Sequence, residues 1–366
     1  MVTDDRTGVL VVCAVAGFGG PVRSITEVLH RLGDRVRVIG ASQGEVVATN
    51  RPDAGDTTSP IGRWSEELIE IPLPRGIGLV RAQLALLRSH RRLRGIDAVH
   101  ANGLTEAVIV APLALLRRRP VTVWVHNYAV PRPFALLRRA AGPLLRRWRW
   151  TAVSATARSL LPDDWDVDIV PNPIDAPPSV APADGPAPCQ VVYLAGTDHP
   201  VKGFDLLADI VEATPPTAAR FVVHAARSQI SHHPASLATW ARLDGALADR
   251  VEVRGFVADV SSVLRDADLV LVPSRRESFN RVLAEALAHG VPIVASDIDA
   301  HVEHFVDEPV GRLFATDDPG AAATAIRELA ADPAERARCA EAGRRRAQLF
   351  DPDLVAATLH ERWTTP

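Results

Sequence analysis

The sequence of 366 residues contains almost no lysine and very little cysteine. Lys202 is its only lysine, and arginine supplies the rest of the basic charge. A compact ammonium is not interchangeable with a guanidinium, so the isolated Lys202 suggests a local need for a point charge, with chance as the alternative. The three cysteines, Cys13, Cys189 and Cys339, have no metal-binding spacing. This pattern favours a reducing compartment over a disulfide scaffold.

Long apolar segments are also missing. The first six residues carry acids and lead into no long apolar stretch, so we expect no secretory signal peptide of the usual form. No apolar run approaches the roughly 20 residues that a transmembrane helix needs. The formal net charge of −3 gives no electrostatic reason to expect nucleic acid as a partner. The expectation is a soluble cytoplasmic protein.

In the first half of the sequence, short β-branched runs alternate with amphipathic stretches. Hydrophobic residues make up 47% of the sequence, which is enough for a full core, and the length favours two domains. We expect strands at 9–15, 36–39, 98–100 and 121–125, and helices at 21–32 and 105–116. A βαβ series of this kind predicts a parallel sheet with helices on both faces.

The Pro- and Ala-rich segment 176–188 is the best linker candidate, and the βαβ pattern restarts after it. The expected elements there are strands at 191–195, 221–225, 251–253, 269–273 and 291–296, helices at 204–213 and 279–289, and a mostly helical tail at 332–363. We therefore expect an α/β fold with two Rossmann-like domains facing each other across a cleft. Residues 1–180 would form the first domain and 181–350 the second, with a helix at 351–366 packing back on the first. In such sheets, ligands bind beyond the carboxyl ends of the strands.

The segment 273–285, PSRRESFNRVLAE, leaves an expected buried strand and enters an expected helix. Ser278 has the residue type of an N-cap. The backbone N–H groups of residues 280–282 would then lie at the helix start, where a phosphate is favoured by both the donors and the helix dipole. We interpret this segment as a phosphate site at the carboxyl edge of the second sheet.

Two glutamates flank this helix start. Glu277 comes just before it, and Glu285 lies more than a helical turn further on. Ionised carboxylates only accept hydrogen bonds, so they suit the hydroxyl groups of a sugar. A capping pattern followed by a surface glutamate is the alternative. The sequence context favours the interpretation as a ligand site.

Two glycine-containing turns also follow expected strands. In GTDHPVKGF (196–204), Lys202 lies beside glycines that allow close backbone approach, and it would be a counter-charge for a phosphate. The turn Gly17-Phe18-Gly19-Gly20 lacks the G-x-G-x-x-G spacing, so a nicotinamide site is not supported. A tight strand-to-helix turn is the alternative to ligand contact at this second position.

His100 and His126 end apolar strands in the first half and are candidates to line the cleft, with a structural role as the alternative. His232 and His233 have the context of a solvated loop. The segment 134–150, FALLRRAAGPLLRRWRW, combines arginine, leucine and tryptophan. Such a segment can lie on an anionic membrane surface or can be a solvated helix face packed on a core. We keep peripheral contact with the inner membrane face as one expectation.

These segments together resemble the GT-B nucleotide-sugar glycosyltransferases, specifically the large retaining glycosyltransferase family 4. The segment ADLVLVPSRRESFNRVLAEALAHGVPIVAS resembles that family's E-x7-E block, with Glu277 and Glu285 as its glutamates. VYLAGTDHPVKGFDLL resembles its phosphate loop, VPNPID the segment that ends the first domain, and GFGGPVRSITEVLHRL the Gly-Gly turn on the acceptor side. The resemblance covers most of the sequence and is densest from residue 191 to residue 311.

The resemblance implies roles for individual residues. Catalytic roles fall to His126, Glu277 and Lys202. Donor binding is expected at Gly19, Gly20, Gly196, Thr197, Lys202, Gly255, Phe256, Glu277, Ser278, Phe279, Asn280, Arg281, Val282 and Glu285. Acceptor binding is expected at Arg23, Asn102, Asn127 and Tyr128. No metal and no other cofactor is expected, because Lys202 and the helix dipole would take over that charge.

Three positions depart from the family pattern. Thr197 stands where the family usually has arginine, so one cation against the diphosphate is missing. Asn280 replaces a glycine, which is a milder change because asparagine tolerates unusual backbone angles. Asn127 replaces a common aspartate. Four arginines are candidates to supply the missing charge: Arg227, Arg275, Arg276 and Arg281.

The expected function is therefore a retaining transfer of a hexose-type sugar from a nucleoside-diphosphate sugar to a hydroxyl acceptor, which would be a glycan, a lipid-linked molecule or a small natural product. The alternatives are a nucleotide-sugar epimerase on the same fold and a non-catalytic nucleotide-sugar binder. The sequence leaves the donor base, the donor sugar and the acceptor open.

Overall fold

The computed structural model forms two compact units, which are described separately. It describes residues 6–14, 20–42, 61–177, 188–195, 201–225, 233–255, 257 and 259–365. Unit 1 comprises Met1–Pro173 together with Pro352–Pro366, and unit 2 comprises Ile174–Asp351. The expected linker falls almost entirely outside the described residues.

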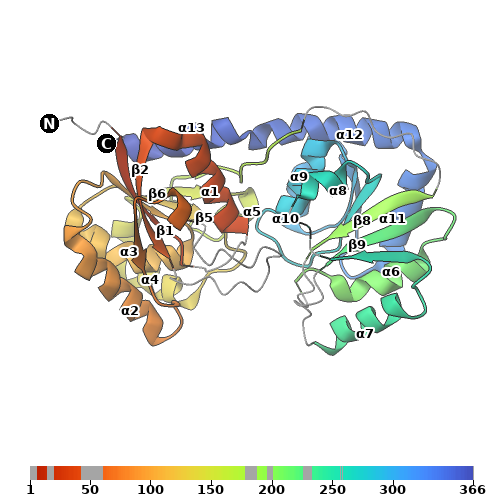
Figure 1. The fold of residues 1–366 in the computed structure, drawn as a ribbon, viewed down its shortest axis with the longest axis horizontal. Helices are drawn as coiled ribbons and strands as arrows, with labels where there is room; N and C mark the ends of the chain where they lie inside the picture. The colour runs from red at the N-terminus through yellow and green to blue at the C-terminus, as the bar shows by residue number, and fades with distance from the viewer. Residues whose placement is uncertain are drawn as a thin grey trace. The chain divides into compact units, whose positions relative to one another are not determined.

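Unit 1 is built on a parallel sheet of seven described strands (Figure 1). The strands are β1 (Thr7–Val12), β2 (Val36–Ser42), β3 (Glu67–Glu70), β4 (Ala98–Ala101), β5 (Val121–Val125), β6 (Arg149–Ala152) and β7 (Val167–Ile169). Their order is β3-β2-β1-β4-β5-β6-β7, and every pairing is parallel. The central strand β1 is buried from Gly8 to Val12, as expected for a strand covered on both faces. This order is that of a Rossmann fold, and its switch point lies between β1 and β4.

Helices cover both faces of this sheet (Figure 1). They are α1 (Gly20–Leu32), α2 (Ile77–Arg88), α3 (Leu104–Arg117), α4 (Arg132–Leu145), α5 (Ala155–Arg158) and α13 (Pro352–Thr364), with short 3-10 turns η1 (Gly33–Arg35), η2 (Gly62–Trp64) and η3 (Ser89–Arg91). α2 packs on α3 and α3 on α4, whereas α13 packs on α1. α13 also contacts β1, β4 and β5, so the last helix of the chain completes the core of the first unit.

Unit 2 repeats the same strand order in a six-stranded parallel sheet (Figure 1). Its strands are β8 (Cys189–Leu194), β9 (Ala219–His224), β10 (Val251–Arg254), β11 (Leu269–Val272), β12 (Ile293–Ser296) and β13 (Gly311–Phe314). They lie in the order β10-β9-β8-β11-β12-β13, with parallel pairing throughout. The switch point therefore lies between β8 and β11, where a Rossmann-like sheet opens a crevice for a ligand.

The helices of unit 2 also form two layers. They are α6 (Leu207–Ala213), α7 (Pro234–Asp244), α8 (Val260–Leu264), α9 (Arg281–His289), α10 (Asp299–Val302), α11 (Pro319–Ala331) and α12 (Pro333–Ala347), with 3-10 turns η4 (Phe204–Leu206), η6 (Glu303–Phe305) and η7 (Gln348–Phe350). α6 packs on α7 and α11, and α9 packs on α8 and α12. On the α6 face, Phe204 fills the core between Tyr193 and Trp240, with ring centroids 5.9 and 5.0 Å away.

The sequence placed most of these elements within a few residues of their observed bounds. The strand at 121–125 coincides with β5, and the tail expected to be helical forms α12 and α13. Two helix starts differ. The helix expected at 204–213 begins as the 3-10 turn η4, a common form of a helix N-terminus. The helix expected at 279–289 begins two residues later, at Arg281.

Candidate functional site

The switch point of unit 2 brings the two expected phosphate segments together. Lys202 follows β8, and Glu277 lies between β11 and α9. The Lys202 ammonium lies 2.7 Å from Glu277 Oε1, and the two side chains are 33% and 11% exposed. Because the two residues are far apart in sequence and come from neighbouring strands, only the strand order could bring them into contact.

Glu277 Oε1 collects further donors. The Ser274 hydroxyl donates to it at 2.9 Å, and the Asn280 amide at 3.3 Å, in addition to Lys202. Among the described residues these three donors converge on one carboxylate oxygen. The carboxylate is therefore held in one orientation, and its second oxygen, Oε2, is left to accept a hydroxyl group of a ligand.

Asn280 links this carboxylate to a buried histidine. Its amide also donates to His301 Nε2 at 3.0 Å, while His301 Nδ1 donates to the Ser296 carbonyl oxygen at 2.9 Å. Burial lowers the pKa of His301, with the Ser296 carbonyl opposing the shift, so the ring is neutral at neutral pH. The Ser296 hydroxyl in turn donates to the Ser274 carbonyl oxygen, which closes the network around Glu277.

The structure corrects the expected start of the helix after this loop. Ser278 is not the N-cap; Asn280 is, and its side-chain oxygen accepts from the Leu283 backbone N–H at 3.2 Å. Asn280 has φ +65°, a conformation that suits the glycine implied here by the family resemblance and that asparagine tolerates. The helix start therefore presents the N–H groups of Arg281 and Val282.

A close contact of backbones fixes the two loops against each other. Gly203 has φ +65°, and a Cβ atom at this position would lie 1.9 Å from the Pro273 carbonyl oxygen. The Arg275 backbone N–H donates to the Val201 carbonyl oxygen at 2.8 Å. The Lys202 loop and the Glu277 loop thus form one rigid edge. A glycine was expected here for close approach to a ligand, but its observed neighbour is the other loop.

The structure also bears on the arginines proposed to replace the missing cation. Arg275 makes a bidentate pair with Asp205 at 2.7 and 2.8 Å and a further bond to Asp317 at 2.5 Å. These carboxylates raise its pKa. Arg281 lies 3.5 Å from Glu285 Oε1 on the same face of α9. Arg275 is thus engaged in joining α9's loop to η4, and the Glu285 carboxylate, 8% exposed, is held beside Arg281.

The remaining donor-site predictions fall on several parts of unit 2. Phe279 is buried, and Gly255 is exposed at the carboxyl end of β10. His224, which the sequence did not single out, ends the neighbouring strand β9, and burial lowers its pKa. The predicted residues Gly19, Gly196, Thr197 and Phe256, and the candidate Arg227, lie outside the described residues.

Unit 1 has a pocket of about 430 Å³ at its own switch point. Its lining includes residues after β1 (Cys13, Ala14), after β4 (Asn102, Gly103) and after β5 (His126, Asn127), with Pro21, Val22, Leu73, Pro74, Arg75, Thr105 and Glu106. Three predicted residues therefore meet here: His126, Asn102 and Asn127. Gly20 starts α1, directly before Pro21. Arg23 instead pairs with Glu27 at 3.0 Å, Tyr128 is 53% exposed, and neither lines this pocket.

The two histidines of unit 1 have different roles. His126 lines the pocket, and its ring lies 4.5 Å from that of Trp124. His100 is fully buried, and desolvation lowers its pKa to about 4. Its Nδ1 accepts from the Trp363 indole N–H at 3.3 Å, so Nε2 carries the proton and faces Asn102 Oδ1 at 3.5 Å. Of the two alternatives for His100, the structure shows the structural role, because the side chain lies in the core and does not line the pocket.

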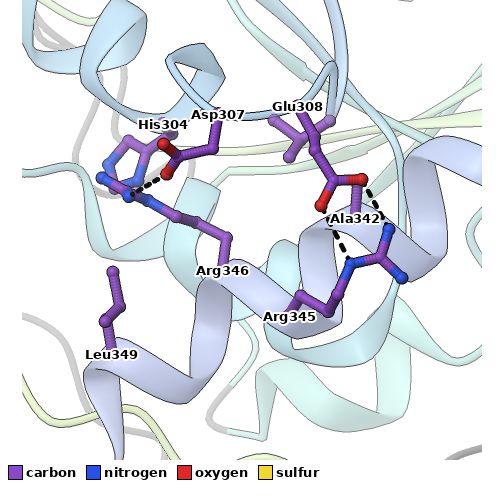
Figure 2. A pocket seen from close by; sticks show the side chains of 8 residues that line it. His304, Asp307, Glu308, Ala342, Arg345, Arg346 and Leu349 are labelled. Atoms are coloured by element: carbon purple, nitrogen blue, oxygen red, sulfur yellow. Dashed lines mark hydrogen bonds and ion pairs between the residues drawn. The ribbon is translucent and has the colours of Figure 1, made fainter.

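Figure 2 shows a pocket of unit 2, which is smaller than the pocket of unit 1. It has a volume of about 200 Å³ and lies between η6 and α12. Its arginines are paired with acids: Arg345 with Glu308 at 2.6 Å and Arg346 with Asp307 at 3.1 Å. His304 lies beside this pocket, and its Nε2 donates to the Phe279 carbonyl oxygen at 3.4 Å. Burial lowers the pKa of His304 to about 3. His304, which lines this pocket, thus connects it to the backbone of Phe279 in the loop after Glu277.

Comparison with known proteins agrees with this geometry. Residues 188–332 match the family model described as "Glycosyl transferases group 1", and residues 18–176 match "Glycosyltransferase Family 4". The chain belongs to the GT-B glycosyltransferases of the family 4 type. This confirms the family resemblance and the prediction of a glycosyltransferase enzyme.

Two curated relatives of this glycosyltransferase act on inositol compounds by name. The phosphatidyl-myo-inositol mannosyltransferase of Mycobacterium leprae is 26% identical over 377 residues, covering 95% of this chain and 93% of the relative. The D-inositol 3-phosphate glycosyltransferase of a Nocardioides species is 35% identical over 186 residues, covering 47% of this chain and 40% of the relative.

Solved structures confirm the fold of this glycosyltransferase. The crystal structure of Anabaena Alr3699/HepE in complex with UDP and glucose matches with a TM-score of 0.75 and 19% identity, covering 97% of this chain and 99% of that one. The two parallel-sheet α/β units are those of the GT-B fold. At this identity the likeness concerns the fold alone.

Proposed function

We propose that the protein is a retaining glycosyltransferase that moves a hexose-type sugar from a nucleoside-diphosphate sugar to a hydroxyl acceptor. The observation that carries this proposal is the contact of Lys202 with Glu277, beside the start of α9 at the switch point of unit 2. It combines a point cation, helix N–H groups and a carboxylate, which suit a diphosphate and a sugar hydroxyl.

In the proposed reaction, the bond between the anomeric carbon and the diphosphate oxygen breaks, and its electron pair stays on the diphosphate. The acceptor oxygen bonds to the same carbon from the same face, and its proton passes to the leaving phosphate oxygen. Lys202 and the N–H groups of Arg281 and Val282 stabilise the charge that develops on the diphosphate. Glu277 orients the sugar, so the contribution of the protein is positioning and electrostatic stabilisation.

No metal is part of this proposal. The described residues contain no group of three or more His, Cys, Asp and Glu side chains that could hold a metal ion. The neutralising groups are those of the chain itself. Removal of divalent cations with a chelator should therefore leave donor turnover unchanged, and a loss of turnover that added Mg²⁺ or Mn²⁺ restores would contradict this part of the proposal.

The names of the relatives favour a cyclitol among the hydroxyl acceptors. One relative is named for phosphatidyl-myo-inositol and another for D-inositol 3-phosphate. For the donor, the Anabaena structure holds UDP and glucose. A donor panel should therefore contain uridine and guanosine diphosphate sugars, and an acceptor panel should contain inositol compounds as well as glycans.

A thermal-shift screen with nucleotide sugars, followed by transfer assays, tests the proposal. A ligand at 100 times its Kd stabilises the folded protein by about 2.7 kcal/mol, which such a screen detects. Lys202→Ala and Glu285→Ala should each weaken donor binding or turnover by at least tenfold, on the order of 1.4 kcal/mol. Arg338→Ala, which removes a paired cation from the exposed face of α12, is the matched control and should have no effect.

Other outcomes of the same assays identify the rival functions. A new sugar appearing on the nucleotide in the absence of any acceptor would indicate an epimerase. Tight donor binding without transfer or hydrolysis across the acceptor panel would indicate a non-catalytic binder. Wild-type kinetics in both Lys202→Ala and Glu285→Ala would remove the support for the site itself.

We also propose a peripheral contact with anionic membranes through α4. No helix of the described residues is long and apolar enough to cross a membrane. On α4, Leu136 and Leu144 are 69% and 45% exposed on either side of a kink at Ala141, and Arg139 is exposed as well. The tryptophans of this segment do not contribute to such a surface, because Trp150 is buried and Trp148 stacks on it with centroids 6.1 Å apart.

Vesicle co-sedimentation tests this contact. The wild-type protein should bind vesicles containing anionic phospholipid more tightly than zwitterionic vesicles, and added salt should weaken the binding. Leu136→Glu should reduce it without changing donor binding. Equal binding to both vesicle types, or full binding by the variant, would argue against α4 as a membrane-contacting helix.

A further inference from the structure

The pocket of unit 1 contains a buried carboxylate that the proposed function does not yet use. Glu106 lies in the first turn of α3, is 4% exposed and lines the cavity of about 430 Å³ together with His126 and Asn127. A carboxylate is almost never buried to this degree unless it has hydrogen-bond partners or a function.

The protein holds this carboxylate in one position. The Ala14 backbone N–H donates to Glu106 Oε1 at 3.0 Å. Gly103 leaves room for the other oxygen, because a Cβ atom at Gly103 would lie 2.6 Å from Glu106 Oε2. Gly103 also has φ +144°, a backbone conformation that residues with a side chain rarely adopt. The loop after β4 is thus shaped around the carboxylate.

The neighbouring amides show which hydrogen bonds the pocket offers. Asn127 accepts from the Leu104 backbone N–H through Oδ1 at 3.0 Å, which leaves its Nδ2 hydrogens as donors. Asn102 is engaged within the protein, because its Nδ2 donates to the Pro21 carbonyl oxygen at 3.0 Å. The pocket therefore combines an acceptor, Glu106, with a donor, Asn127.

The rest of the lining adds an apolar wall and little positive charge. Pro21, Val22, Leu73 and Pro74 supply apolar surface. The titratable or charged side chains that share the described lining with Glu106 are Cys13, His126 and the exposed Arg75. A donor and an acceptor against an apolar wall suit a ring that carries several hydroxyl groups, and a phosphate beside ionised Glu106 would meet a like charge. Burial raises the pKa of Glu106 to about 7.

We propose that Glu106 is an acceptor-recognition residue, which accepts a hydrogen bond from a hydroxyl group of a neutral polyol ring bound in the pocket of unit 1. The ring would pack against the apolar wall, and Asn127 would donate to a second hydroxyl. The inference rests on the proposed function, because it names the part of the hydroxyl acceptor that this pocket recognises.

Binding of a neutral ring to variants of Glu106 tests the inference. The probes are myo-inositol, glucose and mannose, titrated calorimetrically into the full-length wild type, Glu106→Gln and Glu106→Ala. At least one probe should bind the wild type. Above pH 7, where Glu106 is ionised, loss of a hydrogen bond to a charged group should weaken its binding about 10- to 100-fold in Glu106→Ala. Glu106→Gln keeps an oxygen for the Ala14 N–H, so it should fold as the wild type does and lose part of the affinity.

Controls separate this inference from the proposed function. Glu361→Gln removes an exposed glutamate from α13 in the same unit and should bind the probe as the wild type does. Donor binding, measured by thermal shift, should be the same in all four proteins. In transfer assays, Glu106→Gln should raise the KM for the acceptor with little change in kcat.

Two results would overturn the inference. One is a wild type that binds none of the neutral rings at millimolar concentration, and the other is Glu106→Gln and Glu106→Ala both binding as tightly as the wild type. Either result leaves the donor site untouched. A wild type that neither binds nor turns over any nucleotide sugar would instead contradict the proposed function.

Discussion

At the scale of single residues, Asn280 is the position where one side chain has several tasks. Its backbone is left-handed at φ +65°, its oxygen caps α9, and its amide hydrogens bridge Glu277 and His301. A glycine would adopt this backbone more easily but would leave Glu277 without one of its donors. Asparagine at position 280 therefore fixes the Glu277 carboxylate, although glycine would adopt the left-handed backbone more easily.

A pair of substitutions separates these contributions. Asn280→Ala places a Cβ on a left-handed backbone and removes both the cap and the bridge, so we expect it to lower the free energy of unfolding of unit 2 by about 1–3 kcal/mol. Asn280→Gly removes the side chain but relieves the backbone and should cost less. Hydrogen exchange of the α9 amides reports the difference. Equal losses in the two variants would mean that the backbone conformation contributes nothing.

Glu106 gives unit 1 a pH-dependent stability. Its pKa is raised by burial from 4.5 to about 7, so the folded protein keeps this proton where the unfolded chain has released it. The contribution is fully present below pH 4.5 and is lost as the pH rises through 7. The difference between these two pKa values corresponds to about 3 kcal/mol at most in the free energy of unfolding. Unfolding of the wild type and of Glu106→Gln from pH 4.5 to 8 should show the decline in the wild type only.

At the scale of elements, the proposed donor site depends on two loops that touch through their backbones. Gly203 meets Pro273, and Arg275 fastens the same loop region to Asp205 in η4. Lys202 can reach Glu277 only while these loops stay in register. Position 203 therefore needs glycine for two reasons: its φ is positive, and a side chain would clash with the neighbouring loop.

Two glycines with similar backbones test this dependence. Gly203→Ala and Gly33→Ala both place alanine at positive φ, +65° and +50°, but only at Gly203 would the new Cβ meet another atom, the Pro273 carbonyl oxygen at 1.9 Å. Gly33→Ala should cost about 1–2 kcal/mol of stability in unit 1. Gly203→Ala should cost more and should also weaken donor binding at least tenfold. Wild-type donor affinity in Gly203→Ala would show that the contact does not hold the site.

At the scale of the whole molecule, the last helix of the chain belongs to the first unit. The buried Trp363 of α13 donates its indole N–H to His100, which in turn faces Asn102 at the pocket. Truncation of the C-terminus would therefore remove part of the core behind the pocket of unit 1. The second unit lies between the two segments of unit 1 in sequence, so unit 1 is complete only after α13 has been made.

Acid and a conservative substitution should both weaken this anchor. Protonated His100 cannot accept from Trp363, and its pKa is lowered from 6.5 to about 4, so its contribution is present above pH 6.5 and lost as the pH falls through 4. Trp363→Phe removes the hydrogen bond and should cost about 1–3 kcal/mol, because His100 Nδ1 stays buried without a partner. Hydrogen exchange of the α13 and β4 amides measures this loss of stability. Trp148→Phe, at a half-buried tryptophan, is the control. Unchanged protection in Trp363→Phe would contradict this role of the indole.

The sequence predicted the fold well because its evidence is local. Apolar runs and helix periodicity located most strands and helices, and the segment around Glu277 was placed between a strand and a helix, as observed. The N-cap of α9 was predicted two residues early, at Ser278, because local propensity favours serine as a cap and does not reveal a left-handed Asn280. For His100 the sequence left a cleft role and a structural role open, because its partner, Trp363, is 263 residues away.

The sequence by itself determined the two βαβ series, the family resemblance and the segments proposed to bind the donor, since each depends on residues that are neighbours in the chain. Only the tertiary structure decided that Lys202 forms an ion pair with Glu277 and Arg275 with Asp205, and that Glu106 is buried in a pocket. The physical reason is that hydrogen bonds and desolvation depend on distances of a few ångströms between segments. Strand order brings those segments together, and no local pattern records it.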